Sequence, residues 1–139
     1  MSDDWIELCK RSIKRHEGYR PSPYRDTEGI LTIGWGHNLD AKPLSPHVCN
    51  EIFNEDFDDA FMAARREMYF DGLPEAWRMV VIEMFFQLGS KFHSFDNLKV
   101  ALIAGDWDRA RTEMLDSLWA RQTPQRVKDL IALTIGDVA

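Results

Sequence analysis

Two carboxylates, Glu17 and Asp26, lie close together in the sequence but in different local patterns. Glu17 ends a stretch of helically spaced apolar residues, whereas Asp26 begins the turn-forming sequence Asp-Thr-Glu-Gly between two runs typical of β-strands. Enzymes that cleave glycosidic bonds need one carboxylic acid to protonate the leaving oxygen and one carboxylate to activate water or attack the sugar. Two acids in different environments could divide these roles. On spacing alone, Asp26 could equally be a turn former.

The residues around the two carboxylates form a more specific pattern, which continues along the chain. It consists of Glu17-Gly18, Tyr24, Asp26, Gly29, Thr32-Ile33-Gly34 and Gly36-His37. This pattern resembles the phage-type lysozymes, the endolysins of glycoside hydrolase family 24. The resemblance extends to the sequences at 53–56, 85–89 and 119–126, so it covers nearly the whole chain in the family's order.

The resemblance implies a catalytic role for three residues. Glu17 would be the general acid, Asp26 the second carboxylate near the anomeric carbon, and Thr32 a hydroxyl that orients the attacking water beside Asp26. The family precedent implies inversion of the anomeric centre. The residues alone leave inversion and retention open, because the outcome depends on whether the carboxyls are about 6.5–9.5 Å or about 5–5.5 Å apart. Thr32 could also be an ordinary β-branched strand residue.

The resemblance further implies two supporting ion pairs. Arg126 matches the arginine that pairs with the catalytic glutamate in the family, so we expect an ion pair between Arg126 and Glu17. His37 and Asp56 match a structural ion pair of the family, although a simple hydrogen bond from His37 would also fit.

Four residues match the family's substrate-binding positions. Phe86 matches a residue that lines the cleft, although it also fits the apolar stripe of its helix. Asn38, Leu98 and Glu113 fall at other contact positions, where they do not keep the family's usual residue types.

The remaining patterns predict the elements that position these residues. We expect a helix from Asp3 or Asp4 to Glu17, a hairpin from Tyr24 to Ile33, and a long helix of about 24 residues that begins at Ser45-Pro46. Leu73-Pro74 opens a further helix that ends at Gly89. Three more helices follow, separated by turn and cap signals at Gly105-Asp106, Thr123-Pro124 and Gly136.

These elements predict a mostly helical α+β fold in two lobes, and the resemblance implies the lysozyme type, with all 139 residues in one lysozyme domain. Residues 18–44 would form a hairpin lobe, residues 1–17 and 70–139 a helical lobe, and residues 45–69 the helix between the lobes, with a cleft for a polymeric substrate. The segment 39–44 is shorter than the family's usual connection, so we expect a small helix there to be missing.

The charge, cysteine and histidine content of the chain bears on its possible partners and cofactors. The net charge of −6 makes nucleic acid an unsuitable partner. Basic residues cluster between Lys10 and Arg25 and acidic ones between Glu51 and Asp59; both sets could be solvated helix faces, or the basic set could steer an anionic polymer. Cys9 and Cys49 predict two free thiols, with a disulfide as the alternative. We expect no metal and no cofactor, because the four histidines are scattered.

The expected substrate is the glycan of peptidoglycan, and the resemblance implies an endolysin that causes host lysis as a monomer. No basic leader precedes residue 5 and no apolar run reaches the length of a membrane span, so we expect residence in the host cytoplasm, without membrane insertion, until a holin opens the membrane. The alternatives are a lytic transglycosylase, which needs no water-activating Asp26, and a non-catalytic peptidoglycan-binding module.

Overall fold

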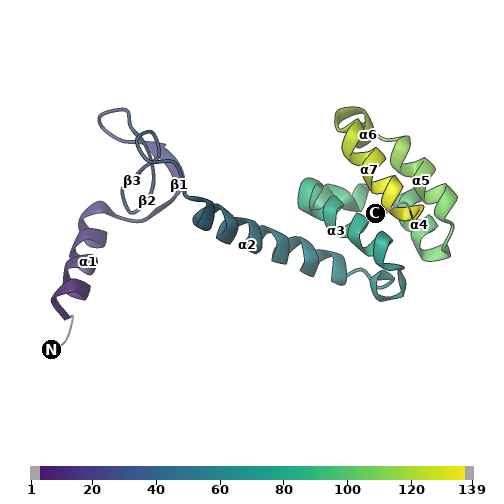
Figure 1. Ribbon diagram of the computed structural model, residues 1–139, viewed down its shortest axis with the longest axis horizontal. Helices are drawn as coiled ribbons and strands as arrows, with labels where there is room; N and C mark the ends of the chain where they lie inside the picture. The colour runs from purple at the N-terminus through teal and green to yellow at the C-terminus, as the bar shows by residue number, and fades with distance from the viewer. Residues whose placement is uncertain (1–3, 137–139) are drawn as a thin grey trace. The chain divides into compact units, whose positions relative to one another are not determined.

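A computed structural model of the chain describes residues 4–136. Its contacts divide the chain into two units, Met1–Glu51 (unit 1) and Ile52–Ala139 (unit 2), each described here by itself. The described residues form seven α-helices and one three-stranded antiparallel sheet, labelled in Figure 1. The predicted class, α+β with mostly helix, is therefore confirmed.

Unit 1 begins with helix α1 (Asp4–Glu17), close to its predicted bounds; Asp3 lies outside the described residues. The helix stops because Gly18 adopts φ 76°, a left-handed conformation that glycine reaches without steric cost. The N–H of Gly18 donates to the carbonyl of Lys14 at 2.9 Å and closes the last turn. Glu17 is thus the last helical residue before the sheet.

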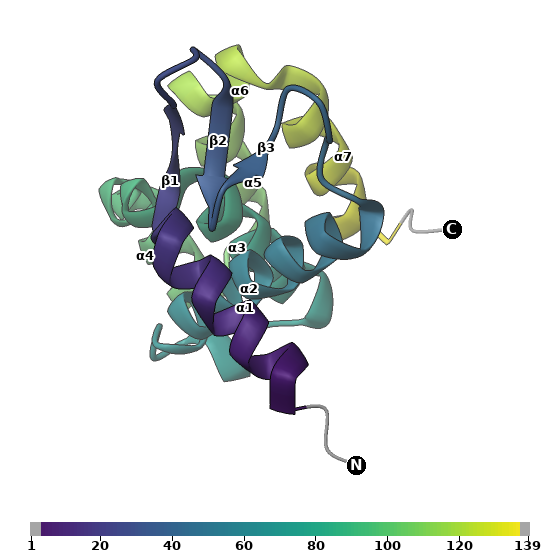
Figure 2. The ribbon, with the colours of Figure 1, turned by 90° about the vertical axis from the view of Figure 1, so that its left-hand side faces the viewer.

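The sheet of unit 1 has the order β1 (Arg20–Arg25), β2 (Leu31–Gly34) and β3 (His37–Asn38). Figure 2 shows the three strands side by side. Thr32 on the central strand pairs with Tyr24 of β1 and with Asn38 of β3. The hairpin of β1 and β2 was predicted, whereas β3 was not, because two residues are too few to show an alternating pattern. Residues 39–44 contain no helix, as expected.

Helix α2 (Pro46–Arg65) contains the boundary between the two units. Ser45 caps its start, since the Ser45 Oγ accepts a hydrogen bond from the N–H of Val48 at 3.2 Å. The helix has 20 residues, fewer than the predicted 24 or so. It ends without a glycine or proline and passes through a turn into the short 3₁₀ helix η1 (Phe70–Gly72), so no sequence signal marks its end.

The rest of unit 2 is helical. Its elements are α3 (Glu75–Leu88), the 3₁₀ helix η2 (Gly89–Ser94), α4 (Asp96–Ala104), α5 (Trp107–Leu115), α6 (Leu118–Gln122) and α7 (Pro124–Thr134). Three helices were predicted after α3, but the structure has four. The extra one is α6, which Ser117 caps by accepting a hydrogen bond from the N–H of Ala120. A five-residue helix is too short to show helical periodicity.

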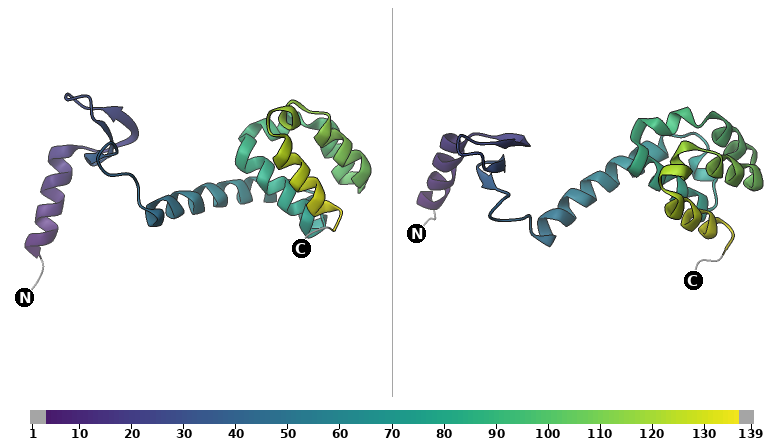
Figure 3. Two further views of the ribbon diagram at one scale, coloured as in Figure 1. Left: turned by 45° about the horizontal axis from the view of Figure 1, so that its top comes forward. Right: turned by 90° about the horizontal axis from the view of Figure 1, so that it is seen from above.

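The apolar core of the described residues lies in unit 2 and centres on α3. Val80, Val81 and Met84 of α3 are completely buried, and Val127 and Leu130 of α7 are buried with them. Figures 1 and 3 show α7 packed along α3. In unit 1 the only buried described residue is Thr32. Among residues 4–136, no helix combines the length and the apolar character that a membrane span needs.

Candidate active site

Glu17, the predicted general acid, lies at the end of α1 with its side chain exposed. Gly36, in the turn between β2 and β3, is its close neighbour. A Cβ atom added to Gly36 would lie 2.6 Å from Glu17 Oε2 and 2.9 Å from Glu17 Cδ. The glycine therefore makes room for the carboxylate against the sheet, and its φ of 73° is one that other residues rarely adopt.

Asp26, the predicted second carboxylate, lies half-buried in the turn between β1 and β2. Its Oδ1 accepts hydrogen bonds from the backbone N–H groups of Glu28 and Ile30, each at 2.9 Å. Its own backbone N–H donates to the carbonyl of Ile30 at 3.0 Å. Asp26 is thus a turn former, as its sequence context suggested. Its Oδ2 receives no hydrogen bond from the described residues and remains available to water.

Thr32 is 4% exposed, on the central strand between the two turns that hold Asp26 and Gly36. Its Oγ1 donates a hydrogen bond to the carbonyl of Ile30 at 2.9 Å. This bond fixes the hydroxyl and leaves the oxygen's lone pairs as acceptors. The carbonyl of Ile30 belongs to the residue whose N–H binds Asp26, so Thr32 and Asp26 hold the same short segment.

Asn38 and His37 lie half-buried on the edge strand β3. Asn38 Oδ1 accepts a hydrogen bond from the N–H of Ala41 at 2.9 Å, and its amide group stays available as a donor. His37 Nε2 lies 2.8 Å from the carbonyl oxygen of Lys42, a hydrogen bond in which the ring nitrogen donates. The predicted partner of His37, Asp56, belongs to unit 2, so their ion pair stays a prediction.

Arg126 of α7 forms an ion pair within unit 2. Its Nε lies 3.0 Å from Glu83 Oε2 on α3, and both side chains are partly exposed. Its predicted pairing with Glu17 of unit 1 stays a prediction. Glu83 was not singled out in the sequence, since one acidic residue in an apolar helix gives no sign of its partner.

Phe86 and Asp56 both line a cavity of about 530 Å³ between α2, α3 and η2, which we call the α2–α3 pocket. Phe86 is 38% exposed, so it is not a core residue of the described structure. Its ring centroid lies 5.6 Å from that of Phe53 on α2. Asp59, Ser90 and His93 complete the polar lining of this pocket.

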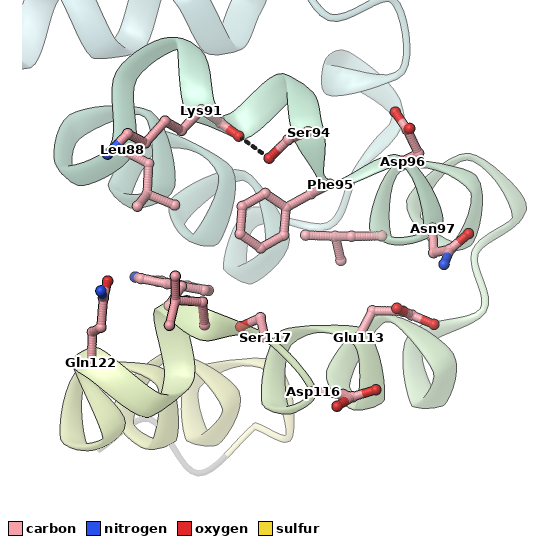
Figure 4. Close-up of a pocket in the computed structure, with 13 residues that line it drawn as sticks. Leu88, Lys91, Ser94, Phe95, Asp96, Asn97, Glu113, Asp116, Ser117 and Gln122 are labelled. Carbon is pink, nitrogen blue, oxygen red and sulfur yellow. Dashed lines mark hydrogen bonds between the residues drawn. The ribbon is translucent and has the colours of Figure 1, made fainter.

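Leu98 and Glu113 line a second cavity of about 560 Å³, drawn in Figure 4, which we call the α4–α6 pocket. Leu98 is buried at its floor, and Glu113 of α5 pairs with Arg109 at 3.8 Å. The indole of Trp119 is fixed by a hydrogen bond from its Nε1 to Gln87 Oε1 at 2.7 Å. Figure 4 shows carboxylates at one end of this pocket and Lys91 at the other. Two predicted contact residues thus share one cavity.

Sequence reasoning missed some residues that belong to these sites. Gly36 was noted only as part of the residue pattern, whereas it contacts Glu17. Tyr19 and Trp35 pack together with tilted rings whose centroids lie 4.7 Å apart, and Lys14 Nζ lies 4.3 Å from the Trp35 ring centroid, so three exposed residues form one cluster in unit 1. Pairwise contacts of this kind leave no periodic signal in a single sequence. Within residues 4–136, no three His, Cys, Asp or Glu side chains are grouped to hold a metal ion.

Comparisons with known proteins agree with this architecture. A family model described as phage lysozyme matches residues 14–132. The chain is 29% identical over 144 residues to the pre-baseplate central spike protein Gp5 of Enterobacteria phage T4, covering 82% of the chain and 25% of Gp5. It thus spans about a quarter of that relative. It is also 25% identical over 159 residues to a probable T4-type lysozyme 1 of Dictyostelium discoideum, covering 92% of the chain and 94% of the relative.

Proposed function

Because this chain belongs to the phage lysozyme family, a family of glycoside hydrolases, we propose that it is a muramidase that hydrolyses the β-1,4 bond between N-acetylmuramic acid and N-acetylglucosamine in peptidoglycan. Glu17 donates a proton to the leaving oxygen, and Asp26 with Thr32 positions and activates the attacking water. In a phage infection, this reaction would weaken the host wall and cause lysis.

The observation that carries the proposal is the arrangement of the two carboxylates around one strand of unit 1. Glu17 contacts Gly36 after the C-terminal end of β2, and Asp26 binds the N–H of Ile30 before its N-terminal end. Four strand residues span about 10 Å between first and last Cα at roughly 3.3 Å per residue. We infer that Asp26 activates a water and that the anomeric centre is inverted, which requires the two carboxyls to lie about 6.5–9.5 Å apart.

The substrate positions follow from the same proposal. Asn38 offers its free amide from the sheet, Phe86 offers an aromatic ring, and Leu98 and Glu113 offer one shared pocket. A glycan strand that carries peptides presents sugar faces, hydroxyls and amides, which such groups can bind. Arg126 and the pair of His37 and Asp56 would support the site rather than touch the sugar.

The proposal is tested by digesting purified peptidoglycan in heavy-oxygen water and analysing the products by mass spectrometry. We expect labelled reducing ends on muramic acid, lost in Glu17→Gln and in Asp26→Asn. Asparagine keeps the Oδ1 acceptor for the N–H groups of Glu28 and Ile30, so Asp26→Asn removes the charge and preserves the turn. Unlabelled anhydro ends would instead identify a lytic transglycosylase, and binding without any products would identify a binding module.

Release and assembly complete the proposal. The chain would act as a monomer and reach the wall through a separate membrane lesion made by a holin. Expression in a bacterial host with and without a holin tests release, because lysis should need both proteins. Sedimentation of the purified chain tests the monomer, and a stable dimer would contradict it.

A further inference from the structure

The last turns of α1 place a lysine beside the proposed general acid. Lys14 precedes Glu17 by three positions, and residues at this spacing are neighbours on the surface of a helix. The other position one turn before Glu17 is Ile13, which carries no charge. Lys14 is therefore the charged residue of α1 that is best placed to form an ion pair with Glu17.

An ion pair of this spacing forms elsewhere on α1 but not at Glu17. Lys10 Nζ lies 3.3 Å from Glu7 Oε1, three positions away. Within unit 1, no described residue forms an ion pair with Glu17. Lys14 Nζ lies instead 4.3 Å from the centroid of the Trp35 ring. The ammonium group that could reach the carboxylate is thus bound to an aromatic ring.

Trp35 lies close to the general acid along the backbone. It directly precedes Gly36, the residue that contacts the Glu17 carboxylate. Its ring is supported by Tyr19, which follows α1 and packs against it with a centroid distance of 4.7 Å. An exposed contact between a cation and an indole is at least as stabilising as an exposed ion pair along a helix. The ring can therefore compete with the carboxylate for the Lys14 ammonium.

Two other cations of unit 1 also have partners that carry no charge. The guanidinium carbon of Arg20 lies 3.9 Å from the centroid of the Tyr24 ring, and Arg25 Nη1 donates a hydrogen bond to the carbonyl of Gly29 at 3.1 Å. Neither arginine forms an ion pair with a described carboxylate. The basic residues that flank the two proposed catalytic carboxylates in the sequence are thus bound to rings or to the backbone.

The position of the Lys14 ammonium matters because a general acid must keep its proton until the leaving oxygen takes it. A cation beside a carboxyl group favours the ionised form, which has no proton to donate. Arg126, the other cation expected near Glu17, would act in the same direction as Lys14. A second cation at the carboxyl would therefore narrow the pH range in which the acid is protonated.

We propose that Trp35 is a positioning residue for the reaction, whose ring holds the Lys14 ammonium away from the carboxyl group of Glu17. Tyr19 supports the ring in this role. The inference rests on the proposed function, since it takes Glu17 as the general acid. It makes Trp35 and Lys14 determinants of the pH range of activity, although neither touches the reacting atoms.

The test compares the pH dependence of kcat for the full-length wild type, Trp35→Leu and the double variant Lys14→Gln/Trp35→Leu on soluble glycan oligomers. Thermal melting checks that each variant folds. In Trp35→Leu the ammonium can pair with Glu17, so we expect the alkaline limb of the profile to move by about half a pH unit towards acid. Activity on that limb would fall roughly threefold. The double variant should regain the wild-type limb, and Trp35→Phe, with a weaker cation site, should lie between.

Lys10 provides the matched control, because Lys10→Gln removes the same charge one turn earlier on α1, where the partner is Glu7. Lys10→Gln should not restore the limb in the Trp35→Leu background. Lys14→Gln alone should keep the wild-type limb, since the ring already holds the ammonium. An unmoved limb in Trp35→Leu, equal rescue by Lys10→Gln, or a Lys14→Gln limb shifted towards alkali would each overturn the inference.

A second measurement needs no activity and separates this inference from the proposed function. The side-chain carboxyl carbon of Glu17 is followed by NMR through a pH titration of the same variants. A midpoint that falls in Trp35→Leu and recovers when Lys14 is removed, in a chain that hydrolyses nothing, would establish the role of the ring and reject the muramidase. Hydrolysis with one midpoint in all variants would reject the inference alone. Trp35→Phe and Lys14→Gln supply the comparison if Trp35→Leu does not fold.

Discussion

At the scale of single residues, the contact between Gly36 and Glu17 makes a clear prediction. Gly36 and Gly34 have almost the same backbone, with φ of 73° and 71°, but only Gly36 has a neighbour within 4 Å of an added Cβ. Alanine at either position should cost about 1–2 kcal/mol of unfolding free energy, because of the left-handed backbone. Only Gly36→Ala should also displace the Glu17 carboxylate. We expect its kcat to fall by about tenfold or more, because a misplaced general acid protonates the leaving oxygen less efficiently.

Comparison of Gly34→Ala with Gly36→Ala separates the effect of backbone strain on stability from the effect of the Glu17 contact on kcat. Chemical denaturation measures the stability loss, and initial rates on peptidoglycan measure the catalytic loss. If Gly34→Ala loses as much kcat as Gly36→Ala, the contact with Glu17 has no special role. The same result would weaken the assignment of Glu17 itself, since its surroundings would then be unimportant for the reaction.

At the scale of elements, the turn after α2 contains a buried tyrosine hydroxyl, that of Tyr69, which lacks a hydrogen-bond partner among the described residues. Burial, and secondarily the nearby Glu67 carboxylate, raises the pKa of Tyr69 far above its ordinary value. We therefore expect Tyr69→Phe to raise the free energy of unfolding by on the order of 1 kcal/mol at neutral pH, since it removes a buried unsatisfied group.

The same shift gives a dependence on alkaline pH. A tyrosine whose pKa is raised by folding stays protonated in the native state while the unfolded chain ionises near pH 10. Ionisation of this group leaves stability unchanged below about pH 10 and lowers it as the pH rises above that value, because the unfolded chain loses the proton first. Denaturation between pH 9 and 11.5 should thus show a steeper loss for the wild type than for Tyr69→Phe. Parallel curves would mean that the Tyr69 hydroxyl reaches water.

Elements with a strong start or stop signal could be predicted from the sequence. Gly18 ends α1, Ser45-Pro46 begins α2, and Pro74 and Gly89 bracket α3. Elements without such signals could not: β3 has two residues, α6 has five, and α2 ends at Arg65 without a breaker. The candidate site likewise has residues that the sequence could predict and contacts that it could not. Asp26 and Thr32 lie in a recognisable hairpin, whereas the contact of Gly36 with Glu17 and the polar wall of the α2–α3 pocket depend on three-dimensional packing.

At the scale of the whole molecule, apolar burial is uneven. Every buried apolar side chain of the described residues lies in unit 2, from Ala60 to Leu130, whereas unit 1 buries only Thr32. Stability follows the amount of apolar surface removed from water, and short chains without a core rarely fold alone. We expect a fragment of residues 46–139, which keeps α2 whole, to unfold cooperatively on heating, and residues 1–45 to be largely unfolded.

Circular dichroism and calorimetry of the two fragments check this expectation. The fragment 46–139 should give a single sharp transition, whereas residues 1–45 should lack one. A folded fragment 1–45 would show that the sheet and α1 are stabilised by something other than apolar burial. A non-cooperative fragment 46–139 would show that unit 2 needs unit 1 to complete its core.

The two cysteines were expected to be free thiols, and the structure leaves both free and exposed. Cys9 lies on α1 and Cys49 in the first turns of α2, and the chain has no other cysteine. A maleimide fluorophore would therefore attach to unit 1 alone, without any engineering of unit 2. With one cysteine replaced by serine, the remaining dye becomes a reporter at a single known position. Its emission could then follow the arrival of a glycan strand in real time.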